Sequence, residues 1–309
     1  MTVSAITMND LAVNIAGVEL KNPVITASGT FNSGKEYSHL IGLNKLGAIT
    51  TKGVSHKPWP GNPPPRTAET YGGMLNAVGL QNPGAKAFIQ EDLPFLSQYN
   101  TKVIVNLCGK TEEEYINVVR DFEGITGVDL FELNISCPNI EAGGMAMGTD
   151  PKMTEHITRQ VKKHTNIPVI VKLSPNVTDI ATIAKAAEAG GADGISLINT
   201  ILGMKIDIHR RQPLLGNKLG GLSGPAIKPI ALRMVYQVAK AVNLPIIGMG
   251  GISTGEDAIE FIIAGATAVA VGMANFSNPQ ATMDIVTGIN TYMNMYNIQN
   301  INDIRGIIQ

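Results

Sequence analysis

The chain has 309 residues, of which 44% are hydrophobic and 16% are charged. This composition is typical of a globular protein, and the length allows one large hydrophobic core or two ordinary ones. The 24 Lys and Arg residues nearly balance the 25 Asp and Glu residues. A net charge of -1 favours neither nucleic acid nor an anionic membrane surface as a partner.

Targeting signals and metal motifs are not apparent in the sequence. No apolar run is long enough to span a bilayer, and the first ten residues lack a basic segment followed by an apolar one, so we expect a cytoplasmic protein. The two cysteines, Cys108 and Cys137, cannot build a disulfide framework and do not form a CxxC pair. His156 and His164 are expected on one helix, two turns apart and facing solvent, and we predict no metal site.

Short apolar runs that alternate with helix-like stretches organise the chain. Residues 11–20 are expected to form a hairpin that turns near Gly17 and lies against the bottom of a barrel. The eight runs that follow span residues 23–28, 48–52, 102–106, 129–134, 168–173, 193–199, 244–251 and 267–272. Strands that alternate with helices pair in parallel, and eight such units in roughly 250 residues are typical of a closed barrel. We therefore predict an α/β fold, a (β/α)8 TIM barrel that forms a single domain over residues 1–309.

Local signals support helices between the runs. Asp150 and Pro151 provide a cap and a first-turn proline for one helix. A second helix has an apolar stripe formed by Ile180, Ile183, Ala184 and Ala187.

Two connections are too long to be simple turns. Residues 53–81 follow the second run and residues 200–224 follow the sixth. Both leave from the carboxyl ends of predicted strands, where barrels build their binding sites. We expect these long loops over the C-terminal face to wall or cover a ligand, the alternative being decoration of the rim.

The residues that end the predicted strands are mostly polar or glycine. In chain order they are Ser28, Lys52, Asn106, Asn134, Lys172, Asn199, Gly250 and Gly272. Two lysines and three asparagines at one barrel mouth predict a site for a polar, partly anionic ligand. Lys172 ends a buried strand, so it needs an anionic partner or must lose its charge. A reduced flavin anion would provide that partner, and the alternative is a Schiff-base lysine acting on a carbonyl substrate.

One stretch in the middle of the chain carries the strongest chemical signal. Residues 130–133 are apolar apart from Glu132, which predicts a buried strand, and Pro138 prevents a helix from starting directly after it. Polar and reactive groups crowd the strand end, namely Asn134, Ser136, Cys137 and Asn139. Two amides flanking a thiol suit a flat ligand edged with C=O and N–H groups, from which the thiol can take a proton. The alternative is a structural cysteine in a turn.

Glycines near the end of the chain indicate a phosphate site. Gly248, Gly250 and Gly251 leave the seventh run, and Gly272 ends the eighth. Residues 253–256 have the spacing of a capping box that opens the next helix. Loops after strands seven and eight are the usual phosphate site of such barrels. A dinucleotide-binding turn is the competing interpretation, but the spacing is not GxGxxG.

Several longer motifs together resemble a known family. They are NISCPN with GTDP downstream, NAVGLQNPG (residues 76–84), LSPNVTDI (173–180), GGLSGPAIKP (220–229), GMGG and AVAVGMANF. From about residue 23 to 279 the chain resembles class I dihydroorotate dehydrogenases, most of all the type-B catalytic subunit. The resemblance implies an FMN-bearing barrel that oxidises (S)-dihydroorotate to orotate in de novo pyrimidine (UMP) synthesis. A cysteine takes a proton from C5 in that family, and hydride passes from C6 to the flavin.

The resemblance also implies residue roles. Cys137 would be the catalytic base. The substrate would contact Lys52, Asn76, Ala77, Val78, Gly79, Leu80, Asn134, Asn139, Asn199 and Thr200. FMN would contact Ser28, Lys52, Gly53, Asn106, Asn134, Lys172, Ile198, Gly224, Gly250, Gly251, Gly272 and Met273. Gly53 and Met273 depart from the family pattern, in which a hydroxyl residue is common at both positions.

A partner is implied as well. Type-B members work with an electron-transfer subunit that carries FAD and a 2Fe-2S iron-sulfur cluster and passes electrons to NAD, in a heterotetramer of two catalytic and two electron-transfer chains. The alternative within the family is type A, a homodimer that reduces fumarate, but residues 140–150 look like type B. A Schiff-base aldolase barrel using Lys172 and a non-catalytic phosphate-binding barrel are the more distant alternatives.

Overall fold

Eight parallel strands close into a barrel in the computed structural model, which describes residues 9–136 and 147–308. The strands are β3 (Val24–Thr26), β4 (Ala48–Thr50), β7 (Lys102–Leu107), β8 (Leu130–Asn134), β9 (Val169–Lys172), β10 (Gly194–Leu197), β15 (Ile246–Met249) and β16 (Ala268–Val271). They pair in chain order, and β16 pairs with β3 to close the ring. The predicted (β/α)8 fold is confirmed.

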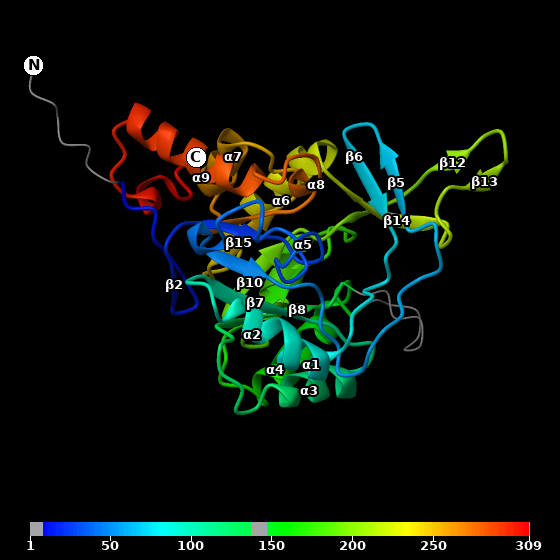
Figure 1. Cartoon of the computed structure of the whole chain (residues 1–309). Coiled ribbons are helices and arrows are strands. Elements are labelled where there is room, and N and C mark those ends of the chain that lie inside the picture. The colour runs from blue at the N-terminus through cyan, green and yellow to red at the C-terminus, as the bar shows by residue number, and fades with distance from the viewer. Residues whose placement is uncertain (1–8, 137–146, 309) are drawn as a thin grey trace, which may run out of the picture.

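Helices surround the barrel (Figure 1). They are α1 (Ala85–Ala87), α2 (Leu93–Leu96), α3 (Glu112–Asp121), α4 (Pro151–Lys162), α5 (Ile180–Ala189), α6 (Lys228–Ala239), α7 (Gly255–Ile263), α8 (Ala274–Ser277) and α9 (Ala281–Met295). Among the described residues, none of these helices is long and apolar enough to cross a membrane.

Local chemistry explains where these helices begin and which face they bury. Asp150 caps α4 by accepting a hydrogen bond from the backbone N–H of Met153, with Pro151 in the first turn, as predicted. The predicted apolar stripe of α5 is buried against the core. The expectation that His164 shares a helix with His156 is wrong, because α4 ends at Lys162.

An antiparallel hairpin covers the amino-terminal end of the barrel. It consists of β1 (Val13–Ile15) and β2 (Val18–Leu20), with Ala16 and Gly17 in the turn. The buried side chains of Val13, Ile15 and Leu20 join the main core. The hairpin and its position agree with the prediction from residues 11–20.

The two long connections form a second sheet beside the barrel mouth (Figure 1). One connection provides β5 (Thr67–Thr70) and β6 (Gly73–Asn76), and the other provides β11 (Ile201–Met204) and β14 (Leu219–Ser223). The sheet order β11-β14-β6-β5 joins the two connections through antiparallel pairing of β6 with β14. The connections therefore build one wall over the carboxyl face, which the sequence patterns did not predict as a sheet.

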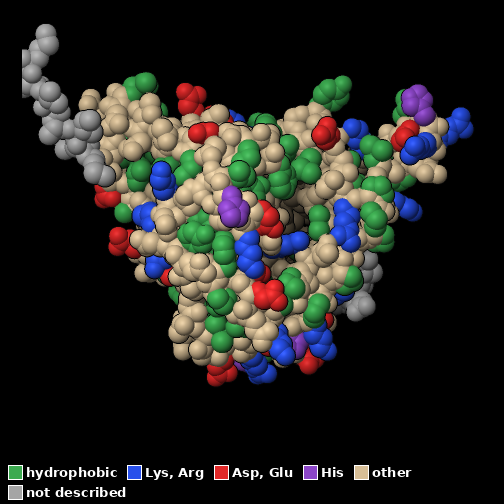
Figure 2. All heavy atoms as spheres, in the orientation of Figure 1, with side chains coloured by type: hydrophobic (Ala, Val, Ile, Leu, Met, Phe, Trp, Pro, Cys, Tyr) green, Lys and Arg blue, Asp and Glu red, His purple; other side chains and the backbone are tan. Residues whose placement is uncertain are grey.

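The second connection also projects a small hairpin. Its strands are β12 (Ile206–Asp207) and β13 (Gln212–Pro213). Figure 2 shows basic and histidine side chains gathered on this projection, and Figure 1 places it at the far edge of the second sheet. Exposed apolar side chains run along the same connection, namely Leu202, Met204, Ile206, Ile208 and Leu219. Exposed apolar groups this close together are typical of a contact surface.

Candidate functional site

A buried polar cluster lies inside the barrel near its carboxyl end. Glu132 of β8 is only 2% exposed. Its Oε1 accepts a hydrogen bond from Asn106 Nδ2 at 2.6 Å and lies 3.4 Å from Lys172 Nζ. Its Oε2 accepts from Ser196 Oγ at 2.8 Å. From the sequence, Lys172 needed either an anionic partner or the loss of its charge. The structure provides the partner within the chain, namely the Glu132 carboxylate.

Only one end of the Asn106 side-chain amide has a hydrogen-bond partner. Its Nδ2 donates to Glu132, whereas its buried Oδ1 has no hydrogen-bond partner. A Cβ added to Gly53 would lie 3.2 Å from this oxygen, so Gly53 keeps open the space in front of it. A buried acceptor without a partner is costly, and a bound N–H group would satisfy it.

Lys52 follows β4 at the same mouth and is half-buried. Burial lowers the pKa of the Lys52 ammonium, the positive charge of Arg66 lowers it further, and the carboxylate of Glu36 opposes them. The lowered pKa means that the ammonium lacks full compensation in the protein alone. An anionic ligand group would supply it.

The segment from Asn76 to Leu80 forms a rigid edge beside Gly53. The Asn62 backbone N–H donates to Val78 O at 3.0 Å, and Asn62 Nδ2 donates to Ala77 O at 3.1 Å. A Cβ at Gly79 would lie only 2.6 Å from the Asn62 side chain, so a larger residue does not fit there. These contacts fix the segment that the family motif assigns to substrate.

Asn199 and Thr200 follow β10 and lead into the second connection. The Thr200 N–H donates to Asn199 Oδ1 at 2.8 Å. Thr200 also packs tightly on Gly221 of β14, whose carbonyl accepts from Asn76 Nδ2 at 3.4 Å. The structure thus brings Thr200 and Asn76 to the same residue, Gly221, although positions 76 and 200 are far apart in the sequence.

The glycines after β15 and β16 meet those of the second connection. A Cβ at Gly251 would lie 2.8 Å from Gly224 O, and a Cβ at Gly224 would lie 2.5 Å from Met273 Sδ. Both glycines have positive φ, +77° at Gly251 and +111° at Gly224. Gly250 and Gly272 lie close to the strand ends as well, with added Cβ atoms 3.3 Å from Ile198 and 3.4 Å from Ala27, the neighbour of Ser28.

The capping box of α7 differs from the prediction by one residue. Thr254 is the cap, its Oγ1 accepts from the Asp257 N–H at 3.1 Å, and Asp257 Oδ2 accepts from the Thr254 N–H at 2.9 Å. The capping box predicted at residues 253–256 therefore lies one residue too early in the chain. Lys228 Nζ donates to Asp257 Oδ1 at 2.6 Å, which joins α6 to α7 beside Gly251.

The Asp257 carboxylate and the Lys228 ammonium balance each other's charge. Burial alone would raise the pKa of Asp257, but hydrogen bonds from Lys228 and from the N–H groups of Ser253 and Thr254 outweigh it and lower the pKa. The hydrogen bond to Asp257 raises the pKa of Lys228 in turn. The pair is thus ionised at neutral pH and stabilises the turn that carries the glycines.

Cys137 and Asn139 lie outside the described residues, but the chain that leads to them is well placed. Asn134 is buried at the end of β8, and its Oδ1 accepts from the Ser136 N–H at 3.2 Å. The Tyr115 hydroxyl of α3 donates to Asn134 O at 2.6 Å. Cys108, the other cysteine, is buried.

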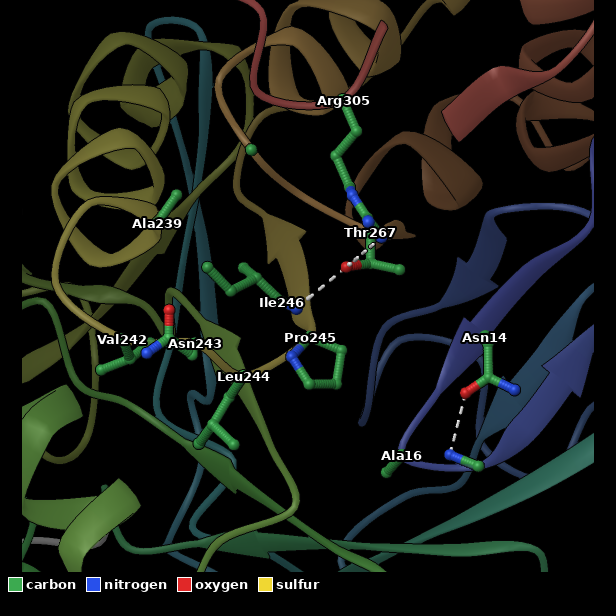
Figure 3. A pocket seen from close by; sticks show the side chains of 12 residues that line it. Asn14, Ala16, Ala239, Val242, Asn243, Leu244, Pro245, Ile246, Thr267 and Arg305 are labelled. Carbon is green, nitrogen blue, oxygen red and sulfur yellow. Dashed lines mark hydrogen bonds between the residues drawn. The ribbon is translucent and has the colours of Figure 1, made fainter. Parts of the chain in front are cut away.

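A separate hollow of about 420 Å³ lies at the opposite end of the barrel. Figure 3 shows it between the β1–β2 turn and the residues that precede β15 and β16, with Arg305 reaching in toward Thr267. None of the strand-end residues discussed above lines this hollow. It lies at the bottom of the barrel, whereas barrels of this kind build their active sites at the carboxyl face, and this separates it from the candidate site. In the described ranges no group of three or more His, Cys, Asp or Glu could hold a metal ion.

The family model described as dihydroorotate dehydrogenase matches residues 10–293. The chain belongs to the dihydroorotate dehydrogenase family. It is 66% identical to the catalytic subunit of dihydroorotate dehydrogenase B (NAD+) from Alkaliphilus metalliredigens, over 96% of this chain and 98% of that protein. The subunits of the same name from Alkaliphilus oremlandii and Thermoanaerobacter pseudethanolicus are 64% and 57% identical, each over 97% of this chain and 99% of the relative.

Dihydroorotate dehydrogenases depend on FMN, and the residues at this mouth fit that cofactor. The buried Asn106 Oδ1 offers an acceptor to a ring N–H, and the Lys172 ammonium offers positive charge nearby. Glycines that tolerate no Cβ leave backbone N–H groups available to phosphate. Sequence reasoning missed Glu132 and Ser196 in this cluster, because their partners are set by strand register rather than by spacing in the chain.

Proposed function

We propose that this chain oxidises (S)-dihydroorotate to orotate in de novo UMP synthesis, as the catalytic subunit of a type-B dihydroorotate dehydrogenase. The observation that carries the proposal is the barrel mouth of a chain of this family, where Asn134 and Lys172 end β8 and β9 and Lys52 follows β4. A dihydropyrimidine has amide donors and acceptors and a carboxylate. Asparagines and an ammonium group are suitable partners for each of these.

The substrate contacts proposed for this chain come from four segments. Lys52 binds the carboxylate of the substrate. This negative charge would compensate the Lys52 ammonium, which burial partly removes from solvent. Residues Asn76, Ala77, Val78, Gly79 and Leu80 and residues Asn134, Asn139, Asn199 and Thr200 surround the ring. The fixed geometry of Asn62 against residues 77 and 78 supports this assignment, because a rigid edge orients a ligand at small entropic cost.

Proton removal is assigned to Cys137. Its thiolate takes the proton from C5 of dihydroorotate, and the amides of Asn134 and Asn139 on either side orient the ring for that transfer. An unperturbed thiol has a pKa of about 8.5, so the thiolate fraction grows through the neutral to mildly alkaline range. Bound FMN supplies the acceptor for the hydride that leaves C6.

The residues proposed to hold FMN are those that the family resemblance implies. Lys172 and Asn106 contact the ring, together with Ser28, Lys52, Gly53, Asn134 and Ile198. The phosphate and the remaining part of FMN lie against Gly224, Gly250, Gly251, Gly272 and Met273. The packing of Gly251 on Gly224 and of Gly224 on Met273 supports a single cradle. Gly53 and Met273 contribute backbone contacts in place of the hydroxyl groups common in the family.

The relatives are named catalytic subunits, and a subunit has a partner. We propose that the partner is an electron-transfer chain with FAD and a 2Fe-2S cluster, in a heterotetramer of two copies of each chain, and that it passes electrons to NAD. Two cysteines in the whole sequence are too few for a cluster with four thiolate ligands, which supports a separate carrier. A single domain over residues 1–309 and a cytoplasmic location stay predictions.

Steady-state assays test the function and the acceptor separately. Purified chain loaded with FMN is mixed with dihydroorotate and an artificial electron acceptor, and orotate formation is measured. The same assay is repeated with fumarate, and with NAD in the presence of the partner. Orotate with the artificial acceptor and with NAD plus partner is expected. Turnover with fumarate alone would place the chain in type A, and no orotate under any condition would refute the activity.

A further inference from the structure

Glu132 takes no part in the roles assigned so far, yet it connects three strands. In the barrel register it lies opposite Asn106 of β7, and β10, which bears Ser196, is not a neighbour of β8. Contact with Ser196 therefore requires the carboxylate to reach across the barrel interior, above β9. The three donors on Asn106, Lys172 and Ser196 come from β7, β9 and β10.

The carboxylate dictates how Asn106 is turned. An ionised carboxylate can only accept hydrogen bonds, so the amide edge that faces it at 2.6 Å must be Nδ2. The oxygen edge then points away from Glu132, toward the space beside Gly53 and Leu80. A neutral acid or amide at position 132 could donate instead, and the Asn106 amide could then rotate.

The same carboxylate holds Lys172. The ammonium lies 3.4 Å from Oε1, and both side chains are almost fully buried. The other lysine placed at this mouth is Lys52, whose pKa is lowered by burial and by Arg66 and is raised by Glu36, with no contribution from Lys172. Within a buried ion pair each charge offsets the other, so Glu132 neutralises part of the positive charge that Lys172 brings to the floor of the site.

We propose that Glu132 is a positioning residue of the flavin site, which turns Asn106 Oδ1 and the Lys172 ammonium toward the ring of bound FMN and thereby sets its reduction potential. This role presupposes the proposed function. It acts through two neighbours and requires no contact between Glu132 and FMN. Charge near a flavin ring changes the relative stability of its oxidised and reduced forms, since the reduced form is richer in electrons.

The Glu132→Gln variant tests the role in the FMN-loaded chain. Glutamine keeps the volume but removes the negative charge beside Lys172, so the ammonium is no longer neutralised and the reduced flavin gains stability. We expect the ratio of reduced to oxidised FMN at a fixed potential to rise at least tenfold, which is about 30 mV for a two-electron couple. The dissociation constant of FMN is expected to rise as well, since Asn106 loses its fixed orientation. Spectroelectrochemistry and FMN titration of apoprotein measure the two effects.

A double variant covers the case in which an unpaired Lys172 prevents folding. Glu132→Gln with Lys172→Met removes both charges and leaves no buried cation. Its reduction potential is expected to lie below that of the wild type, opposite to the single variant. If the ratio of reduced to oxidised FMN at a fixed potential stays within twofold of the wild-type ratio in both variants, the positioning role is overturned.

Two controls separate this role from general stability and from the proposed function itself. Ser196→Ala removes the hydrogen-bond donor to Glu132 Oε2 but keeps the charge of Glu132. The ratio of reduced to oxidised FMN at a fixed potential should therefore change less than threefold. Thr282→Val replaces a buried hydroxyl without a hydrogen-bond partner in α9, remote from the mouth, and should leave both readouts unchanged. A wild-type chain that binds no FMN contradicts the proposed function. If the wild-type chain binds FMN and Glu132→Gln changes neither the reduction potential nor the FMN affinity, only the role of Glu132 is contradicted.

Discussion

Asn134 and Lys172 lie directly opposite each other, in register at the carboxyl ends of the neighbouring strands β8 and β9. Both backbones are tied to neighbouring elements, since Asn134 O accepts from the Tyr115 hydroxyl and Lys172 O accepts from Ser136 Oγ at 3.5 Å. The pair thus fixes the point at which the chain leaves the barrel toward Cys137. Strand register brings to one level of the barrel the amide that we propose for substrate and the ammonium that we propose for FMN.

The first prediction concerns Cys137. Replacing it with alanine removes the proposed base, so flavin reduction by dihydroorotate should slow by about 10²-fold to 10⁴-fold, the usual contribution of a general base. In the wild type the rate should rise with pH as the thiolate forms. Anaerobic stopped-flow absorbance measures that half-reaction.

Cys108→Ala is the matched control for this variant. Cys108 is buried and has no proposed part in proton transfer, so its removal should leave the rate of flavin reduction nearly unchanged. Full activity in Cys137→Ala, or a wild-type rate that does not vary with pH, would remove Cys137 from the role.

The second prediction concerns Lys52 and the pH dependence of binding. Burial places the pKa of Lys52 below its ordinary value of 10.5, and only the protonated form attracts a carboxylate. The affinity for orotate should therefore be full below that lowered pKa and should fall as the pH rises through it. Orotate is titrated into FMN-loaded Cys137→Ser protein, which removes the thiol as a second titrating group.

Lys52→Gln in the same background provides the comparison. We expect weaker orotate binding at neutral pH, by about tenfold to a hundredfold for a charge-assisted hydrogen bond worth about 1.5–3 kcal/mol. The affinity of this variant should no longer depend on pH in the alkaline range. Identical alkaline profiles in the two proteins would show that another group is responsible.

The third prediction concerns the anchor of β8. Tyr115→Phe removes the hydroxyl that donates to Asn134 O and leaves a buried carbonyl without that donor. The free energy of unfolding should fall by about 1–3 kcal/mol, as measured by denaturant titration. Tyr71→Phe is the control, because Tyr71 is fully exposed and should change stability by little. Equal stability of the two variants would show that the Tyr115 hydroxyl bond is not stabilising.

The fourth prediction concerns Asp257, the capping-box partner of Thr254. Asp257→Asn should lower the free energy of unfolding at pH 7 by about 1 kcal/mol, the usual value of a helix cap. The folded pKa of Asp257 is lowered, so its stabilisation is present above the unfolded pKa of about 3.9 and is lost as the pH falls through the folded pKa. The difference between variant and wild type should accordingly shrink below pH 4. The exposed Glu256, changed to Gln, should show no such difference.

The barrel could be predicted from sequence, and its strand ends could be located to within one or two residues. Buried parallel strands are short and apolar, so Asn134 and Lys172 end β8 and β9 as predicted, whereas Lys52 lies two residues beyond β4. Local signals such as the Asp150 cap of α4 were also sufficient, because cap and helix are neighbours in the chain. The register of the α7 capping box was ambiguous by one residue, since Ser253 and Thr254 are both able to cap and the bond to Asp257 selects Thr254.

Features that depend on distant contacts could not be predicted. Glu132 looked like an interruption of an apolar strand, and only the register of β7 to β10 shows that three donors surround it. The second sheet was equally hidden, because pairing of β6 with β14 joins segments from two connections on different strands. Tertiary pairing of this kind leaves no periodic signal in either segment.

The most direct test of the account is the visible absorption spectrum of the purified chain, followed by anaerobic addition of dihydroorotate. The account predicts a yellow protein that contains one FMN per chain, and bleaching of its absorbance as dihydroorotate is converted to orotate. A colourless protein that takes up no FMN on reconstitution, or bound flavin that dihydroorotate leaves oxidised, would contradict it.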